Sequence, residues 1–332
     1  MTDIINETIK KLQNQFGKGT ILNINNQKEL IEVIPSGSLM LDNILGVGGF
    51  PKGRITEIYG NESCGKTTIS LQAVVQCQGL GGKCVYIDLE HALDLSYCKK
   101  LGIDLDNLIV IQPESAEQTF SIIEALLKTG TIDLIVVDSV AALVPKAELD
   151  GDFGDQTMGL HARIMSKGLR IIQTLLEKNS TAIIFINQIR EKIGVMYGNN
   201  ETTTGGRALR FYASLRLELR RSELLKDSDN VIGIKIAVKT VKNKLAPPMQ
   251  KAFVDIFFDK GYDETNEIID FALEKGVIEK RGSWFYYKDE KIGQGKDNTK
   301  KILLENSDLY LKVKDDSIKA VVQQDDVIKL TN

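Results

Sequence analysis

One eight-residue segment constrains this chain more than any other, because it matches the pattern G-x-x-x-x-G-K-[ST] at every fixed position. The residues of this phosphate loop are Gly60, Asn61, Glu62, Ser63, Cys64, Gly65, Lys66 and Thr67. The glycines let backbone N–H groups turn inward toward phosphate oxygens. The lysine brings positive charge to the β- and γ-phosphates, and the hydroxyl after it is placed to bind Mg²⁺. The loop therefore predicts a site for a nucleoside triphosphate with Mg²⁺.

The residues around the phosphate loop supply the strand–loop–helix setting that it requires. Residues 54–59 predict a strand, and the apolar run after Lys66 predicts a helix that begins under the phosphates. A helix N-terminus carries about half a positive charge, which favours a bound anion. A glycine-rich turn without a ligand is the alternative, and this setting disfavours it.

Composition narrows the class of protein. A chain of 332 residues, 42% hydrophobic and 26% charged, is long enough for a large domain with a smaller one, or for two domains. No apolar run reaches membrane-spanning length and the N-terminus lacks a signal-peptide pattern, so we expect a cytoplasmic protein without a membrane partner. The cysteines, which lack C-x-x-C spacing, predict neither a metal site nor disulfides: Cys64, Cys77, Cys84 and Cys98. The formal charge of -3 argues against a globally basic nucleic-acid binder.

Hydrophobic patterning divides the chain. Near the N-terminus, Ile5, Ile9, Leu12 and Phe16 form one helical stripe, which could pack on its own core or on a neighbouring subunit. Strand-like and helix-like runs then alternate, which predicts an α/β fold with a mainly parallel central sheet. Beyond Gly261 the composition changes to a short helix, an aromatic cluster and a polar stretch. We expect four parts: an N-terminal helical extension (1–30), a core (31–262), a small α+β C-terminal domain (263–315) and a mobile tail (316–332).

Four of the predicted strands end in groups that phosphoryl chemistry needs, at the edge where ligands bind in open α/β sheets. Gly60 begins the phosphate loop after the first strand, and Glu90, Asp138 and Gln188 lie at the ends of the other three. Asp138 is expected to act on the magnesium side with Thr67. Glu90 is the candidate to orient and deprotonate the attacking water. Gln188 is the candidate sensor of the γ-phosphate, and the long glycine-rich segment 189–206 after it is a candidate switch that nucleotide orders.

Further motifs carry a resemblance. The segments in question are Pro35 to Leu39, Gly46 to Gly49, Glu90 to Asp94, Val136 to Leu143, Asn187 to Arg190, Glu201 to Gly206, Lys242 to Lys244 and Ile292 to Gly295. Together with the phosphate loop, and in this order from about residue 8 to 312, they resemble the bacterial RecA recombinases. The resemblance implies a RecA-like P-loop NTPase core and a DNA-dependent ATPase. It implies a helical filament on single-stranded DNA that pairs homologous duplex DNA and exchanges strands in recombinational repair.

The resemblance also implies roles for individual residues. Thr68, Asp94 and Tyr97 join the nucleotide site, with Tyr97 stacking on adenine, while Lys242 and Lys244 reach a neighbour's nucleotide. DNA loops are expected at about 151–159 and 189–206. The DNA-binding candidates are Met158, Arg163, Arg190, Tyr197, Thr204, Gly205, Gly206 and Arg207. The N-terminal helix is expected to dock on the adjacent subunit, and a self-cleaving repressor of the SOS response and loading or mediator proteins are implied partners.

Two departures and two rival functions accompany this interpretation. Cys64 stands where a small hydroxyl or alanine is usual, and its position near Lys66 and a helix N-terminus predicts a lowered thiol pKa. The tail beyond Asp315 mixes acidic with basic residues, so its control of DNA access is open.

A ring helicase or other motor ATPase would share the fold but unwind DNA directionally. A small-molecule kinase would need an acceptor pocket and a lid, which no segment clearly predicts.

Overall fold

A computed structural model describes residues 2–17, 31–152, 159–191 and 201–330. Contacts group the chain into two compact units, Met1–Ile31 and Glu32–Asn332. The first unit contains α1 (Thr2–Phe16), in which Ile5 and Leu12 of the predicted stripe are exposed. Its docking on a neighbouring subunit stays a prediction.

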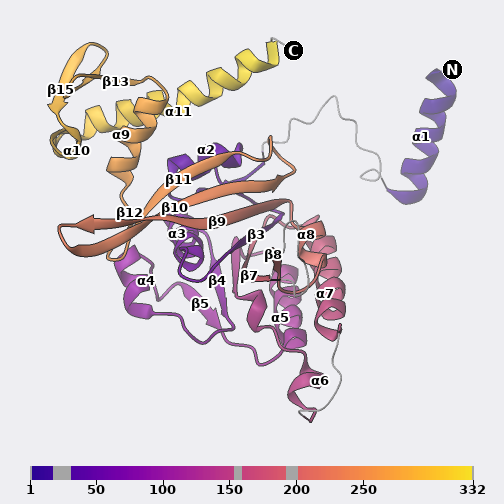
Figure 1. Cartoon of the computed structure of the whole chain (residues 1–332). Coiled ribbons are helices and arrows are strands. Elements are labelled where there is room, and N and C mark those ends of the chain that lie inside the picture. Colours follow the sequence, from indigo (N-terminus) through magenta and orange to yellow (C-terminus); the bar gives the residue numbers. More distant parts are fainter. Residues whose placement is uncertain (1, 18–30, 153–158, 192–200, 331–332) are drawn as a thin grey trace. The chain divides into compact units, whose positions relative to one another are not determined.

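The second unit is built on a large sheet with ten strands in the described residues (Figure 1). In spatial order they are β12 (Gly261–Tyr262), β11 (Lys251–Phe257), β10 (Asn230–Asn243), β9 (Leu215–Asp227), β3 (Ile55–Gly60), β7 (Ala182–Glu191), β6 (Leu134–Asp138), β4 (Cys84–Asp88) and β5 (Leu108–Ile111), with β8 (Glu201–Thr203) beside β7. Pairing is parallel from β9 through β5 and antiparallel from β9 to β12. The predicted α/β fold with a mainly parallel sheet is confirmed.

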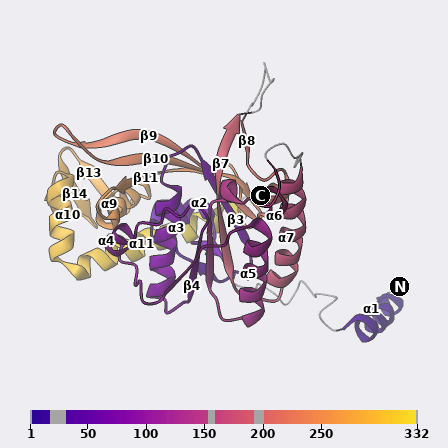
Figure 2. The same cartoon turned by 90° about the horizontal axis from the view of Figure 1, so that it is seen from below.

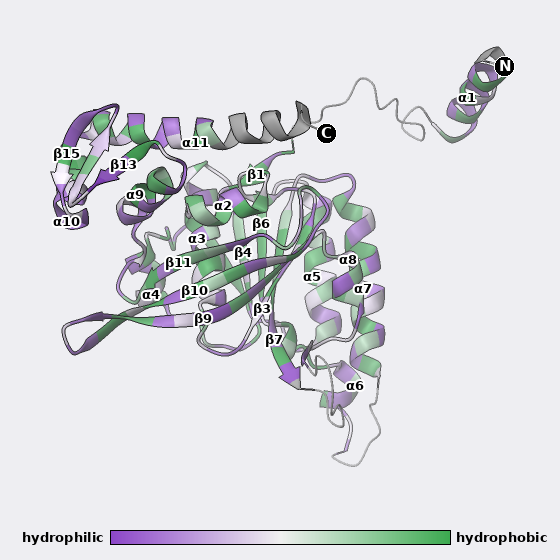
Figure 3. Ribbon diagram, turned by 45° about the horizontal axis from the view of Figure 1, so that its top comes forward, coloured by the Kyte–Doolittle hydropathy of each residue, from purple (hydrophilic) through white to green (hydrophobic). Residues whose placement is uncertain are grey.

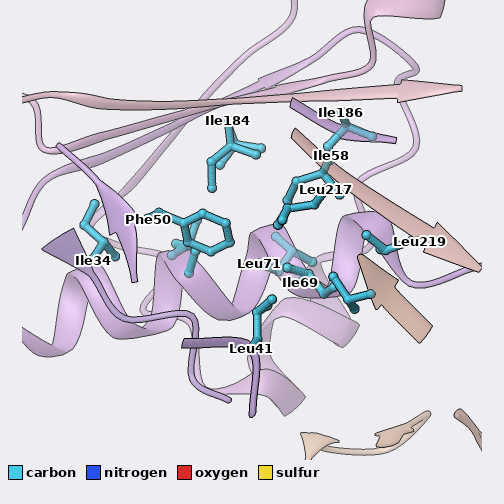
Figure 4. Close-up of a cluster of buried hydrophobic side chains, with 14 of the residues drawn as sticks. Ile34, Leu41, Phe50, Ile58, Ile69, Leu71, Ile184, Ile186, Leu217 and Leu219 are labelled. Atoms are coloured by element: carbon cyan, nitrogen blue, oxygen red, sulfur yellow. The ribbon is translucent and has the colours of Figure 1, made fainter. Parts of the chain in front are cut away.

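Helices cover both faces of the parallel part, so β4 and β6 are buried along their whole length. One face packs against α3 (Lys66–Gly79) and α4 (Leu95–Leu101), and the other against α5 (Ala116–Thr129) and α7 (Leu160–Leu176) (Figure 1). Ile58, Ile184 and Leu217 lie in the first of these two cores, on the side of the sheet that faces Ile69 and Leu71 of α3 (Figure 4). In hydropathy colouring, apolar residues dominate the middle of the sheet (Figure 3).

The remaining core elements are short. They are β1 (Val33–Ile34), α2 (Leu39–Leu45), β2 (Phe50–Pro51), the 3-10 helix η3 (Val140–Ala142), α6 (Lys146–Leu149) and α8 (Ala208–Tyr212). At the start of α5, Ser115 Oγ accepts a hydrogen bond from Gln118 N, and Gln118 Oε1 accepts one from Glu114 N at 2.8 Å. This is a reciprocal N-terminal cap. None of the described helices has the length and apolarity that a bilayer crossing needs.

The C-terminal part has a hydrophobic cluster of its own. Its elements are α9 (Glu264–Glu274), β13 (Ile278–Arg281), β14 (Trp284–Tyr287), β15 (Glu290–Gln294), α10 (Lys296–Glu305) and α11 (Ser307–Leu330). Helix α11 continues without a break past residue 315, where the sequence predicted a tail, and Ser317 in it is buried. The domain boundaries at 262 and 315 and the mobility of the tail stay predictions.

A buried carboxyl group joins this part to the core. Glu267 in α9 accepts hydrogen bonds from the Ser38 hydroxyl and from Met40 N at 3.0 Å, at the N-terminus of α2. Burial raises the pKa of Glu267 from 4.5 to about 7, against the lowering effect of these hydrogen bonds. Burial likewise raises the pKa of neighbouring Asp42 to about 7, and the charge of Glu267 contributes to that rise.

We expect Glu267→Gln to change how stability depends on pH. Because the folded pKa lies above the unfolded value, the folded protein holds a proton that the unfolded chain releases between pH 4.5 and about 7. The free energy of unfolding should therefore fall as pH rises through this window, by up to about 3 kcal/mol for this group. Thermal melts of wild type and Glu267→Gln from pH 5 to 8 should show the variant losing less stability. Glu274→Gln, exposed on the same helix, is the control, and parallel curves for Glu267→Gln would contradict the assignment.

Candidate nucleotide-binding and active site

The phosphate loop lies between β3 and α3 in the setting that the sequence predicted. Ser63 (φ 56°) and Gly65 (φ 85°) have left-handed backbone, and α3 begins at Lys66. Alternation of this kind forms a concave nest of backbone N–H groups, which suits a phosphate. A Cβ atom at Gly60 would lie 2.4 Å from Leu219 O, so only glycine fits the start of the loop. The loop therefore fits a triphosphate.

Lys66 closes the loop on itself. Its ammonium group donates hydrogen bonds to Gly60 O at 3.1 Å and to Asn61 O at 2.6 Å. The ammonium group is therefore held at the phosphate loop itself by two carbonyl oxygens of that loop.

Asp138, at the end of β6, lies against the helix that follows the phosphate loop. One of its oxygens, Oδ2, accepts hydrogen bonds from Thr67 Oγ1 at 2.8 Å and Tyr86 OH at 2.7 Å. Burial raises the pKa of Asp138, while the two hydroxyl groups lower it. A hydroxyl and a carboxylate side by side are hard oxygen ligands, and Mg²⁺ commonly takes only one or two protein ligands beside phosphates and water. These two residues therefore fit Mg²⁺, although the described residues contain no cluster of three metal-binding side chains.

A hydrogen bond joins Glu90 to Gln188, although β6 lies between the strands from which they come. Glu90 follows β4, Gln188 lies in β7, and Gln188 Nε2 donates a hydrogen bond to Glu90 Oε1 at 3.2 Å. The Ser139 hydroxyl donates to the same oxygen. Because β4, β6, β7 and β3 are neighbours in the sheet, Glu90, Asp138, Gln188 and the phosphate loop lie along one edge. The sequence did not single out Tyr86 or Ser139, although Ser139 follows Asp138 directly.

The predicted adenine-side residues form the start of α4. Asp94 is its N-cap, and Asp94 Oδ1 accepts hydrogen bonds from Ser96 N at 2.8 Å and Tyr97 N at 3.1 Å. Tyr97 OH lies 3.1 Å from Thr68 Oγ1 in α3, so α4 is tied to the helix of the phosphate loop. Burial raises the pKa of Tyr97, whose phenol stays neutral near neutral pH.

Lys242 lies at the end of β10, and Lys244 directly follows that strand. Lys242 Nζ donates hydrogen bonds to Arg210 O at 2.7 Å and Phe211 O at 3.0 Å, in the last turn of α8. Burial, Lys244 and Arg216 lower the pKa of Lys242. Lys244 is exposed, and its role and that of Lys242 toward a neighbouring subunit stay predictions.

The structure places part of the expected DNA-binding set. Arg163 is exposed in the first turn of α7, and Arg190 is exposed in β7 opposite Thr202 of β8. These two strands project beyond the sheet (Figure 2). The other described candidates follow β8, namely Thr204, Gly205, Gly206 and Arg207. Met158 and Tyr197 lie outside the described residues.

The prediction of a lowered pKa for Cys64 is wrong. Its side chain is buried, at 1% exposure, and burial raises the thiol pKa more than Lys66 lowers it. The sequence places Cys64 near positive charge but does not show that the loop folds over its sulfur. We therefore expect a poorly reactive thiol.

Comparison with known proteins extends over nearly the whole chain. Residues 3–263 match the RecA N-terminal domain family and residues 266–321 match the RecA C-terminal domain family. Protein RecA of Malacoplasma penetrans (strain HF-2) is 57% identical over 308 residues, 92% of each chain. Protein RecA of Ureaplasma parvum serovar 3 is 52% identical over 316 residues, 95% of each chain. Protein RecA of Bacillus subtilis (strain 168) is 51% identical over 308 residues, 92% of this chain and 88% of that one. On these matches, the chain belongs to the RecA family.

Proposed function

We propose that the edge of the sheet formed by the phosphate loop, Glu90, Asp138 and Gln188 hydrolyses ATP. As a RecA-family member, the protein is a recombinase, a single-stranded-DNA-dependent ATPase that forms filaments and exchanges homologous strands in DNA repair and the SOS response. The observation that carries the proposed site is the convergence of these groups from four neighbouring strands.

In the proposed reaction, Glu90 orients and deprotonates the attacking water. Ser139 and Gln188 support this role because their hydrogen bonds fix one carboxylate oxygen. Lys66 leaves the carbonyl groups of its own loop to bind the β- and γ-phosphates. Gln188 exchanges its bond to Glu90 for one to the γ-phosphate, which changes the start of segment 189–206.

The nucleotide site is proposed to include a metal ion and adenine contacts. Thr67 and Asp138 would hold Mg²⁺, which neutralises charge that develops on the phosphates. Tyr97 would stack on adenine, with Asp94 and Thr68 beside it. Lys242 and Lys244 would reach the nucleotide of an adjacent protomer.

DNA contact is proposed for the two loop regions and their flanks. The residues are Met158, Arg163, Arg190, Tyr197, Thr204, Gly205, Gly206 and Arg207. The segment after Gln188 is only slightly basic, since Arg190, Lys192 and Arg207 accompany Glu191 and Glu201. Affinity should therefore come from many protomers acting together and fall with salt. We further propose a cytoplasmic location, homologous duplex DNA as second partner, and a self-cleaving repressor and mediator proteins as protein partners.

Mixing two inactive variants tests the role of Lys242 across the subunit interface. Lys242→Ala and Glu90→Gln should each lack DNA-stimulated hydrolysis. In a head-to-tail assembly, each site would take Glu90 from one protomer and Lys242 from its neighbour. In a random equal mixture, both residues should be intact at about a quarter of the sites, and about a quarter of the wild-type activity should return. Lys239→Ala, an exposed position on the same strand, should stay active alone. A mixture as inactive as its components would place Lys242 outside the neighbour's site.

A strand-exchange assay tests the function as a whole. Circular single-stranded DNA and homologous linear duplex DNA should yield joint molecules only with ATP. Directional unwinding without joint molecules would favour a motor ATPase. ATP hydrolysis indifferent to DNA, with phosphate transfer to a small molecule, would favour a kinase.

A further inference from the structure

An ion pair is buried in the sheet directly behind the phosphate loop. Glu57 in β3 is fully buried, and Arg216 beside it in β9 is 8% exposed. Arg216 Nε donates to Glu57 Oε2 at 2.5 Å, and the guanidinium group lies 4.6 Å from the centre of the Tyr59 ring. Removing two charges from water is costly, so a buried ion pair is weak grounds for inferring stability. The role of this ion pair follows instead from the side chains that it contacts.

The pair holds the side chain of Asn187. Asn187 Nδ2 donates to Glu57 Oε1 at 2.9 Å and to Thr204 O at 3.1 Å. Asn187 Oδ1 accepts from Gln188 N at 2.9 Å. The orientation of the amide is unambiguous, because its nitrogen faces two acceptors and its oxygen faces an N–H group. Asn187 is fully buried, so breaking any of these bonds would leave a polar group unsatisfied.

These bonds tie together two parts of the chain that are distant in sequence. Glu57 lies three residues before Gly60, the first residue of the phosphate loop, while Thr204 lies near the end of segment 189–206. Gly205 and Gly206 follow with φ of 84° and 75°, a backbone that other residues rarely adopt. Thr204 therefore lies between the end of β8 and this left-handed turn. The Asn187 amide fixes the position of the Thr204 carbonyl group through its hydrogen bond.

We propose that Asn187, held by the Glu57–Arg216 pair, is a positioning residue that fixes the end of the DNA-contacting segment relative to the phosphate loop. It rests on the proposed function of that segment. The connection is separate from the Gln188 side chain, which points to Glu90. Gln188 serves nucleotide sensing at the start of the segment, whereas Asn187 anchors its end to the strand that carries the phosphate loop. DNA stimulation should depend on this anchor more than hydrolysis without DNA does.

The test measures ATP hydrolysis by the full-length protein over a range of oligo-dT concentrations. Asn187→Ala should keep the DNA-free rate and the KM for ATP within about twofold of wild type, while the DNA concentration for half-maximal stimulation rises about tenfold or more. Arg220→Gln is the matched control, because Arg220 makes an exposed ion pair with Glu201 at the other end of β8 and should change little.

Asn187→Asp gives a second, pH-dependent readout. At pH 8 its carboxylate would face Glu57 and repel it, whereas a protonated acid can donate one of the two hydrogen bonds that the amide donates. DNA stimulation by Asn187→Asp should therefore recover in part between pH 8 and pH 6 relative to wild type. This comparison within one variant decides the question if Asn187→Ala does not fold.

Two outcomes would overturn the proposal. One is a wild-type DNA dependence in Asn187→Ala, or in Asn187→Asp at both pH values. The other is an equal fall of DNA-free and DNA-stimulated rates, which marks a general role in the active site. If wild-type hydrolysis itself ignores oligo-dT, the proposed function fails instead, and the variants are not needed to show it.

Discussion

Glu90→Gln should lower DNA-stimulated ATP hydrolysis by about 10²–10⁴-fold, the range that a general base contributes. The glutamine keeps the size of the side chain and can still accept the hydrogen bond from the Ser139 hydroxyl. It cannot take a proton from water. Nucleotide binding and nucleotide-dependent DNA binding should persist, because Lys66, Thr67 and Asp138 are untouched.

The measurement compares steady-state phosphate release with DNA affinity in the presence of ATP. Glu114→Gln is the matched control, because Glu114 is an exposed acid that follows the neighbouring strand β5. It should hydrolyse ATP at the wild-type rate. Turnover within about threefold of wild type in Glu90→Gln would assign the base to another residue, since general-base catalysis contributes far more than this.

Lys66→Ala should raise the Kd for ATP by roughly 100-fold. The phosphate loop contains no other basic residue, and a charged group contributes about 1.5–3 kcal/mol per hydrogen bond to phosphate. In the described structure the ammonium group is held at the loop by Gly60 O and Asn61 O, the carbonyl groups that it would exchange for phosphate oxygens. Equilibrium titration with a fluorescent ATP analogue measures the change.

Lys99→Ala supplies the comparison for Lys66→Ala, because Lys99 is an exposed lysine in α4, on the expected adenine side. Its Kd for ATP should match that of wild type. Lys66→Arg should recover part of the affinity, since it keeps the charge while changing the donor geometry. Unchanged affinity in Lys66→Ala would mean that the loop binds phosphate through its backbone alone.

The sequence predicted elements whose determinants are local. The phosphate loop specifies its own turn, and the alternation of strand-like with helix-like runs predicted the mainly parallel sheet. The sequence also predicted that Glu90, Asp138 and Gln188 lie close together, because they follow parallel strands whose carboxyl ends share one edge of the sheet.

Features set by distant partners could not be predicted in the same way. Past Leu219, β9 is mostly exposed and polar, and only its ladder with β10 makes it a strand. From the sequence alone, Tyr86 is expected to be an ordinary core aromatic residue, and only the fold brings its hydroxyl group to Asp138. The burial of Cys64 and the bond between Asn187 and Glu57 likewise depend on how separate segments pack.

Electron microscopy of the full-length protein with circular single-stranded DNA tests the central claim most directly. That claim is that nucleotide bound at this edge of the sheet governs assembly of many protomers on DNA. With a non-hydrolysable ATP analogue, the account predicts continuous helical filaments on the DNA, and with Lys66→Ala it predicts few or none. Wild-type protein that stays as separate protomers on or off DNA, whatever triphosphate is supplied, would contradict it.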